Sequence, residues 1–402
     1  MAKSLVFNNL TEEILDLGMH SFADTFIPRD KLNSSEPIYQ LACLLDPLTG
    51  MITNKIITED YDRYNLYDYS YTSSNSNFAK NHWRDFAKFI DNLMHKKNSS
   101  ILEIGANDGY LCSVLKNYNH NVLAIDSSKS MTELCRQRGI SAINMVFNLK
   151  NVENTNLTGT KYNCIIANNV FNHANNPLDF LLAVKSLLTQ DGLFVFEVPY
   201  WLKLVESLHF DQIYHEHISY FTIFSLQNLL ILADFEIIDF EIVDYHGGSL
   251  RVISQIKNSA TNVNTTKIND QISFEKNKGL FDKKTYIEFE QKIKNKRSKF
   301  LANLHNLKTT NPNIPFVGVG AAAKANTLLT YYGLNSTYID FITDMSEFKI
   351  GKFTPLTRIP IFSDEAFNNS KHFYAIVLSW NISATLKQSI LSVNRNVRFL
   401  EL

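Results

Sequence analysis

The sequence predicts an α/β protein, and two observations support this fold class. Across residues 81–258, short apolar runs alternate with helix-length segments, which is the pattern of a parallel sheet with helices on both faces. A shorter region, residues 314–378, repeats the same alternation. Residues 1–75 lack it, so we expect a small N-terminal module before a central and a C-terminal α/β domain.

Length, composition and charge set further bounds. The 402 residues, 45% of them hydrophobic, can bury the cores of two or three domains. With 39 basic and 40 acidic residues the net charge is −1, so no charge excess is available to hold nucleic acid or an anionic membrane. Neither a transmembrane run nor a signal-peptide pattern occurs. We therefore predict a cytoplasmic protein, a monomer or small homo-oligomer, with no nucleic-acid or membrane partner.

The N-terminal module, residues 1–75, has weak periodicity and several turn signals, such as Asp46-Pro47. It ends in a tyrosine-rich run that includes Tyr69 and Tyr71. The chain's cysteines have no C-x-x-C spacing and lie in apolar surroundings, which predicts buried free thiols rather than metal ligands. They are Cys43, Cys112, Cys135 and Cys164.

The central domain, residues 76–258, is expected to be Rossmann-like, because each apolar run is followed by a segment of helical length. The expected strands are Ser100–Ile104, Asn121–Ile125, Asn163–Ala167 and Gly192–Val198.

Residues 259–312 shift to Asn, Lys and Thr and predict a connector with a long helix. One apolar stripe marks the packed face of that helix. Its members are Phe289, Ile293, Phe300, Leu304 and Leu307. Residues 313–402 then form the second Rossmann-like domain, with strands expected at Ile314–Val319, Tyr338–Thr343 and Phe373–Leu378.

The segment Leu102–Gly109 (LEIGANDG) reads as a nucleoside-cofactor loop. Gly105 and Gly109 would let the backbone turn tightly and approach a ligand. Asp126, about twenty residues on, ends the next strand and could accept hydrogen bonds from ribose hydroxyls. The loop lacks the close G-x-G of pyrophosphate binders, which favours S-adenosylmethionine over NAD. The alternative is an ordinary tight turn.

Several strings together resemble a known family, the S-adenosylmethionine-dependent C-methyltransferases of nucleotide-linked keto-deoxysugars, and the resemblance covers nearly the whole chain. The strings are Leu15–Gly18, Tyr69–Ser74, Leu102–Gly109, Asn168–His173, Glu197–Tyr200, Phe210–His217, His246–Arg251, Gly318–Lys324 and Arg358–Ile361.

The resemblance implies a three-part enzyme with S-adenosylmethionine as cofactor. The implied substrate is a 4-keto-6-deoxyhexose on a nucleoside diphosphate, methylated beside the ketone, usually at C3, for branched-sugar and polysaccharide biosynthesis. Family members usually carry a four-cysteine zinc site in the N-terminal module. Here Asp46 and Thr49 stand in place of the last cysteine pair. We predict a related module without zinc or any other metal.

The Tyr214-His215-Glu216-His217 segment offers acid-base groups. Forming a carbon nucleophile requires removal of the α-proton, for which neutral His217 is a suitable base. Tyr214 would donate to the enolate oxygen or relay through water, and Glu216 would orient an imidazole or bind a sugar hydroxyl. The segment could be extended or helical, and we expect His215 to be structural. Without the resemblance, a polar loop with satisfied histidines is the favoured interpretation.

The resemblance extends the candidate site. It implies that Asn168 binds cofactor, that Asn169 binds substrate and that His173 lies in the substrate site as a further candidate for catalysis; the alternative is that the asparagines cap the next helix. Glu103 and Asn107 of the loop join the cofactor set.

The N-terminal tyrosine that closes over the sugar in this family matches Tyr71, a catalytic candidate, or Tyr69, a substrate contact. In the C-terminal domain, Gly320 and Lys324 suit a diphosphate, although a plain turn with a solvent-facing lysine is the alternative. Arg251 is a candidate phosphate or sugar contact, or equally an internal ion-pair residue.

Two other functions remain open at this point. An O- or N-methyltransferase acting on a sugar or small molecule would use the same base without needing a ketone. A non-catalytic homologue would bind sugar nucleotide as a scaffold.

Overall fold

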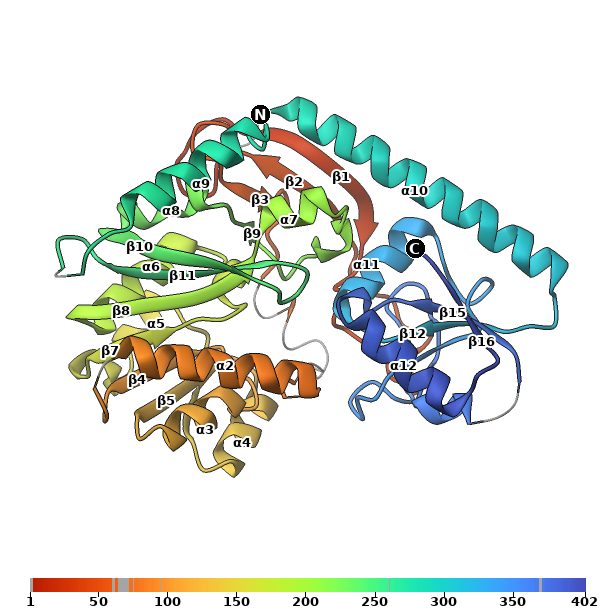
Figure 1. The fold of residues 1–402 in the computed structure, drawn as a ribbon, viewed down its shortest axis with the longest axis horizontal. Helices are drawn as coiled ribbons and strands as arrows, with labels where there is room; N and C mark the ends of the chain where they lie inside the picture. Colours follow the sequence, from red (N-terminus) through yellow and green to blue (C-terminus); the bar gives the residue numbers. More distant parts are fainter. Residues whose placement is uncertain are drawn as a thin grey trace.

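The protein consists of two α/β lobes side by side, with the N-terminal strands and a long helix lying across the top of both (Figure 1). The computed structural model describes residues 3–59, 62–63, 72–74, 76–94, 96–259, 261–368 and 371–402. Tyr69 and Tyr71 lie outside these residues. Among the helices of the described ranges, none is long and apolar enough to cross a membrane.

The N-terminal strands form an antiparallel sheet that is completed by a later part of the chain. Its order is β1 (Glu12–His20), β2 (Tyr39–Leu45), β3 (Ile52–Asn54) and β9 (Ser219–Tyr220). Since β9 follows the Tyr214–His217 segment by only two residues, this sheet, here called the N-terminal sheet, fixes one end of that segment.

A buried aspartate organises the turn between β2 and β3, where members of the resembled family usually carry a cysteine pair. Asp46 accepts hydrogen bonds from Asn9 Nδ2 at 2.9 Å and from Thr49 Oγ1 at 2.7 Å. No group of three or more His, Cys, Asp or Glu residues among the described residues could hold a metal ion. All four cysteines are buried and free, as predicted.

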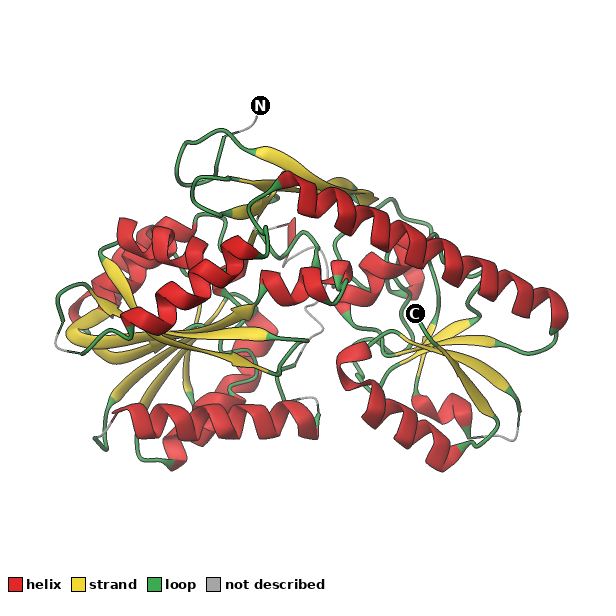
Figure 2. Ribbon diagram, turned by 45° about the horizontal axis from the view of Figure 1, so that its top comes forward, coloured by secondary structure: helices red, strands yellow, loops and turns green. Residues whose placement is uncertain are grey.

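The central lobe is built on a seven-stranded sheet in the order β10-β11-β8-β7-β4-β5-β6. Figure 2 shows the strands of this lobe in yellow, with red helices on both sides of them. All neighbours pair in parallel except β11, which is antiparallel to β8 and β10. The four predicted strands are present as β4, β5, β7 and β8. The bounds are β4 (Ser100–Ile104), β5 (Asn121–Asp126), β6 (Ser141–Asn144), β7 (Tyr162–Ile166), β8 (Leu188–Pro199), β10 (Phe235–Val243) and β11 (Ser249–Ile256).

Several helices of the central lobe begin at a side-chain cap. Ser128, Asn176 and Thr222 each accept a hydrogen bond from a backbone N–H of the first turn that follows, which satisfies a donor left unpaired at a helix start. The helices are α2 (Asn77–Met94), α3 (Tyr110–Asn117), α4 (Lys129–Gln137), α5 (Leu149–Glu153), α6 (Pro177–Leu187), α7 (Trp201–Glu206) and α8 (Ile223–Leu232).

Two helices connect the lobes, α9 (Thr265–Asn277) and α10 (Lys283–Thr310). The apolar stripe predicted for the long helix is buried from Phe289 to Leu304. The buried Glu275 of α9 accepts the backbone N–H groups of Ile223 at 2.8 Å and Phe224 at 3.0 Å, so the connector is tied to the start of α8.

The C-terminal lobe has a five-stranded parallel sheet in the order β14-β13-β12-β15-β16. The three predicted strands are present, and β14 and β16 extend the sheet at its edges. The elements are β12 (Phe316–Val319), α11 (Ala323–Tyr332), β13 (Phe341–Thr343), β14 (Ile361–Phe362), β15 (Phe373–Val377), α12 (Ser383–Val393) and β16 (Val397–Leu400).

Direct contacts hold the C-terminal lobe to the rest of the chain. Asn326 Nδ2 donates to the carbonyl of Ala23 at 2.6 Å, and Thr327 Oγ1 donates to the carbonyl of Ile213 at 3.0 Å. Both donors lie on the first turns of α11, at the face of the lobe that meets the central lobe.

Candidate active site

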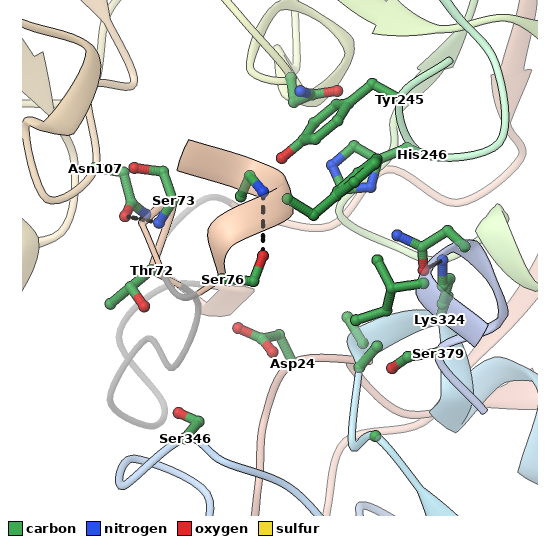
Figure 3. Close-up of a pocket in the computed structure, with 18 of the residues that line it drawn as sticks. Asp24, Thr72, Ser73, Ser76, Asn107, Tyr245, His246, Lys324, Ser346 and Ser379 are labelled. Atoms are coloured by element: carbon green, nitrogen blue, oxygen red, sulfur yellow. Dashed lines mark hydrogen bonds between the residues drawn. The ribbon is translucent and has the colours of Figure 1, made fainter. Parts of the chain in front are cut away.

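A cavity of about 500 Å³ lies between the two lobes, and this volume is within the range of ligand sites in proteins. Asn107 lines it from the central lobe and Lys324 from the C-terminal lobe, with Asp24 of the N-terminal segment between them (Figure 3). Loops that follow parallel strands of both lobes form most of the wall. Ligands of α/β sheets bind at this end of the strands, so the cavity is the candidate active site.

The loop after β4 turns as the sequence predicts, but its two glycines have different roles. Gly105 lines the cavity with φ +69°, and a Cβ there would lie 2.8 Å from Cβ of Val170. Gly109 has φ +74°, and a Cβ there would lie 2.5 Å from Sγ of Cys135. Gly105 therefore allows this cavity-lining turn to pack against Val170, whereas Gly109 allows α3 to start against α4.

Two acidic residues support this loop in different ways. Glu103 lines the cavity, accepts a hydrogen bond from Cys112 Sγ at 2.8 Å, and has its pKa raised by burial to about 8. Asp126 accepts the backbone N–H groups of Asn107 at 2.7 Å and Ser128 at 2.8 Å, and burial raises its pKa to about 6. Asp126 thus holds the loop in shape by accepting a hydrogen bond from the backbone of Asn107.

Asn168 and Asn169, after β7, both line the cavity. Asn168 Oδ1 accepts the backbone N–H of Glu197 at 2.9 Å, while its Nδ2 is buried without a hydrogen-bond partner. The Oδ1 of Asn169 is also buried and unpartnered, and the residue has φ +53°. The helix that follows is capped by Asn176 instead, so the capping alternative does not apply.

The Tyr214–His217 segment is a turn, neither extended nor helical. The backbone N–H of His217 donates to the carbonyl of Tyr214 at 3.0 Å. The His217 Nδ1 is 2.8 Å from the carbonyl oxygen of Gln212. A carbonyl only accepts, so Nδ1 carries the ring proton and Nε2 presents its lone pair. Burial lowers the pKa of His217 to about 4, which keeps the ring neutral.

Two other predicted side chains gather around His217. Its ring centroid is 3.9 Å from that of Tyr214 and 5.1 Å from that of His173, and all three residues line the cavity. Burial lowers the pKa of His173 well below its ordinary value, so it too is neutral. His215 points elsewhere and packs edge-on against Phe22 and Tyr39, in the structural role expected for it.

Glu216 also lines the cavity, beside a carboxylate that the sequence reasoning missed. Burial raises the pKa of Glu216 to about 8, and the nearby charge of Asp24 acts in the same direction. Asp24 comes from the stretch after β1, where no motif marks it. Gln212 and His246 also line the cavity and were not predicted as site residues. Both lie in strings that carry the family resemblance, and this was the sequence signal that could have identified them.

The C-terminal wall carries two lysines together with three acidic residues, Asp344, Glu347 and Asp364. Gly320 has φ +87°, and a Cβ there would collide with the Ser379 side chain. Lys324 is buried, donates from Nζ to Asn381 Oδ1 at 2.5 Å, and has its pKa lowered by burial to about 8. It does not face solvent, contrary to the alternative considered for it. Lys349, which the sequence did not single out, also lines the cavity and donates to the carbonyl of Ala321 at 2.9 Å.

Arg251 occupies an internal ion pair, which was the alternative considered for it. Its guanidinium is 2.8 Å from Oε1 of buried Glu197 and 3.0 Å from Oε2 of Glu241, and it stacks on Phe86 and Phe89. Of the predicted site residues that the structure describes, Arg251, Gly109 and Asp126 do not line the cavity.

Two family models match adjoining parts of the chain, a methyltransferase domain over residues 78–239 and a C-methyltransferase C-terminal domain over residues 244–399. The chain is also 26% identical over 314 residues to the C-methyltransferase NovU of Streptomyces niveus, a match that spans 78% of this chain and 74% of that protein. The chain belongs to the S-adenosylmethionine-dependent C-methyltransferases. This C-methyltransferase is therefore an enzyme, as the cofactor loop and the YHEH segment predict.

Solved structures resemble about half of this C-methyltransferase. An S-adenosylmethionine-dependent methyltransferase of Clostridium acetobutylicum is 15% identical, with 46% of this chain and 94% of that chain covered at a TM-score of 0.37. The magnesium protoporphyrin IX methyltransferase of Synechocystis PCC 6803, solved with bound S-adenosylhomocysteine, is 13% identical, with 44% and 83% covered at a TM-score of 0.36. Likeness at this level adds nothing on substrate.

Proposed function

We propose that this C-methyltransferase acts on a nucleoside-diphosphate-linked 4-keto-6-deoxysugar, from which it removes a proton beside the ketone before methylating that carbon, at C3. The observation that carries the proposal is a neutral, buried His217 with Nε2 available, in a cavity that the buried Lys324 of the C-terminal lobe also lines. A base and a lysine in one cavity suit a keto sugar attached to a diphosphate.

The central wall fits the cofactor. When bound, S-adenosylmethionine supplies an electrophilic methyl group on a positively charged sulfur. Gly105 lines the cavity without a side chain, and the buried Nδ2 of Asn168 is a donor in need of an acceptor. Glu103 and the Asn107 amide add polar groups on the same wall. These four residues would hold the cofactor, with Asp126 fixing the loop behind them.

Proton removal follows from the tautomer of His217. Its Nε2 takes the α-proton, and the Gln212 carbonyl keeps the ring oriented through Nδ1–H while the ring becomes cationic. The electron pair left on carbon is delocalised onto the ketone oxygen, where Tyr214 would donate a hydrogen bond. Burial and the charge of Asp24 both raise the pKa of Glu216, which favours the protonated carboxyl that would donate to a sugar oxygen.

The C-terminal wall would hold the diphosphate. The backbone turn at Gly320 approaches the cavity closely, and Lys324 and Lys349 both line it. A diphosphate beside Lys324 would favour its charged form and raise its pKa again. Anchoring the substrate at this end would hold the ring carbon at near-attack distance from the methyl group. Positioning of this kind can lower the activation free energy by about 7–11 kcal/mol.

The direct test is to incubate the protein with S-adenosylmethionine and a panel of dTDP-, GDP- and CDP-linked 4-keto-6-deoxysugars, following product mass and the α-proton by NMR. We expect a gain of one methyl group together with loss of the α-proton signal at C3. A methyl group on oxygen or nitrogen, or no product with any sugar of the panel, would contradict the proposed substrate.

A further inference from the structure

Trp380 of the C-terminal lobe lies at a junction between the two walls of the cavity. It opens a 3-10 turn, Trp380–Ile382, directly after β15 and Ser379. Its neighbours Ser379 and Asn381 line the cavity, whereas the indole points behind the wall, toward the central lobe. Nothing in the sequence pattern singled this residue out.

The indole makes three contacts of different kinds. Its Nε1–H donates to Oδ2 of Asp211 at 2.6 Å. Its ring stacks on the imidazole of His209, with centroids 3.6 Å apart and planes 20° apart. The Nζ of Lys324 lies 3.8 Å from the ring centroid, in cation–π geometry. One side chain therefore contacts the cavity's lysine and the chain segment just before the YHEH turn.

The central lobe leaves space for this ring. Gly247 has φ +82°, and a Cβ at that position would lie 2.5 Å from Cη2 of Trp380. Asp211, the acceptor of the indole N–H, is only 2% exposed, so its carboxylate depends on protein donors rather than water.

The contact leads by short steps to the base. Asp211 is followed in the chain by Gln212, in the 3-10 turn Phe210–Gln212. The Gln212 carbonyl accepts from His217 Nδ1 at 2.8 Å, and its side-chain Nε2 donates to the carbonyl of His246 at 3.0 Å. The orientation of the His217 ring therefore depends on where this turn is held.

We propose that Trp380 is a positioning residue for His217, which it holds in register through Asp211 and Gln212 from the opposite lobe. This proposal rests on the proposed function, in which His217 removes the α-proton. The C-terminal lobe then contributes to proton removal as well as to substrate binding. Loss of the indole N–H should slow the proton step more than it weakens binding, because a base displaced by about 1 Å can lose roughly 100-fold in rate.

The test uses Trp380→Phe in the full-length protein, which keeps an aromatic ring for His209 and Lys324 but removes the donor to Asp211. The readout is deuterium exchange at the α-carbon of the accepted keto sugar, with S-adenosylhomocysteine in place of the methyl donor. We expect exchange and kcat to fall between about 10- and 100-fold, with KM for the sugar nucleotide changed by less than about threefold.

A matched control is Trp201→Phe, which removes another buried indole donor, here to Tyr286 Oη at 2.8 Å. Trp201 is outside the described cavity lining, so this variant should lose stability without loss of exchange. Asp211→Asn, which still accepts from Trp380, should retain exchange within about threefold, whereas Asp211→Leu should match Trp380→Phe. The double variant Trp380→Phe with Asp211→Leu should exchange no more slowly than either single variant, because both changes remove the same contact.

Equal exchange rates in Trp380→Phe and the parent protein would overturn the proposal. If Trp380→Phe does not fold, the Asp211→Asn and Asp211→Leu pair decides, and equal exchange in those two would also overturn it. Absence of exchange in the parent protein with every sugar of the panel would instead overturn the proposed function.

Discussion

The two lobes use the same backbone device to form opposite walls of one cavity. In the central lobe, the loop after the first strand donates from Asn107 N to Oδ2 of Asp126 at 2.7 Å. In the C-terminal lobe, Ala321 N donates to Oδ2 of Asp344, also at 2.7 Å. Each aspartate ends or follows the neighbouring strand, and its other oxygen accepts a second N–H two residues on, at 2.8 Å in both cases.

The side chains around this shared device differ in charge. The central loop is flanked by Glu103, whereas the C-terminal side of the lining carries the lysines Lys324 and Lys349 beside the acidic residues Asp344, Glu347 and Asp364. Among the described lining residues, lysines that could hold a phosphate come only from the C-terminal lobe. The glycine turn and its aspartate are therefore common to both lobes, whereas the lysines are what distinguish the C-terminal lining from the central one.

The largest effect should come from removing the base on the central side. His217→Ala should lower kcat by about 100- to 10,000-fold, the usual contribution of a general base. Binding of S-adenosylmethionine, measured by calorimetry, should stay within about twofold of the parent value. A variant with substantial residual exchange of the α-proton would show that the base lies elsewhere in the cavity.

Removing the cation from the C-terminal side should affect binding more than chemistry. Lys324→Met keeps an unbranched chain over Trp380 but loses the charge, so KM for the sugar nucleotide should rise by about 10- to 100-fold, the equivalent of a lost charged hydrogen bond. Lys299→Met, an exposed change on α10, is the matched control and should leave KM unaltered. A larger effect on kcat than on KM would argue against a phosphate contact.

The two turn glycines offer a symmetric comparison. Gly105→Ala and Gly320→Ala each force a Cβ into a left-handed backbone position that an L-residue adopts at a penalty of about 1–2 kcal/mol. We expect the first to weaken binding of S-adenosylmethionine about tenfold and the second to weaken binding of the sugar nucleotide by a similar factor. If either change affected both ligands equally, the division of the cavity into two walls would be wrong.

The smallest effect concerns pH. Burial lowers the pKa of His217 to about 4, so the imidazole stays neutral and able to accept a proton throughout the range in which an ordinary histidine titrates. The rate of α-proton exchange should change by less than about twofold between pH 6 and 7 and should fall only as pH drops through about 4. If the exchange rate instead fell with a midpoint near pH 6.5, His217 would titrate as an ordinary histidine, and its ring would have to be in contact with water.

The strands and site residues that could be predicted from the sequence are those whose pattern lies within one short segment. Strands β4 and β7 are buried apolar runs and were predicted to within one residue at each end, whereas β8 begins four residues before the predicted run. Strand β6 has four residues, none of them buried, and was missed. The Gly105 turn was identified because its glycines, strand and acidic residue lie within one short segment.

The parts of the site that were missed depend on contacts between distant segments. Asp24 reaches the cavity because Asn326 holds the carbonyl of Ala23, a contact across 303 residues of sequence. The alternation in the YHEH segment suggested an extended or helical form, but the turn is set by Gln212 and by the strand that follows. Arg251 shows the converse, since a basic residue after two glycines proved to be paired with Glu197 inside the lobe.

The pairing of β3 with β9 has a consequence for synthesis of the chain. Ile52 and Thr53 pair with Tyr220 and Ser219, which leave the ribosome long after them. At typical rates of about 5–20 residues per second, the edge of β3 waits on the order of ten seconds for its partner. During that interval an open strand edge is exposed to wrong pairing. Nascent chains therefore need protection at this edge until the central lobe is largely made.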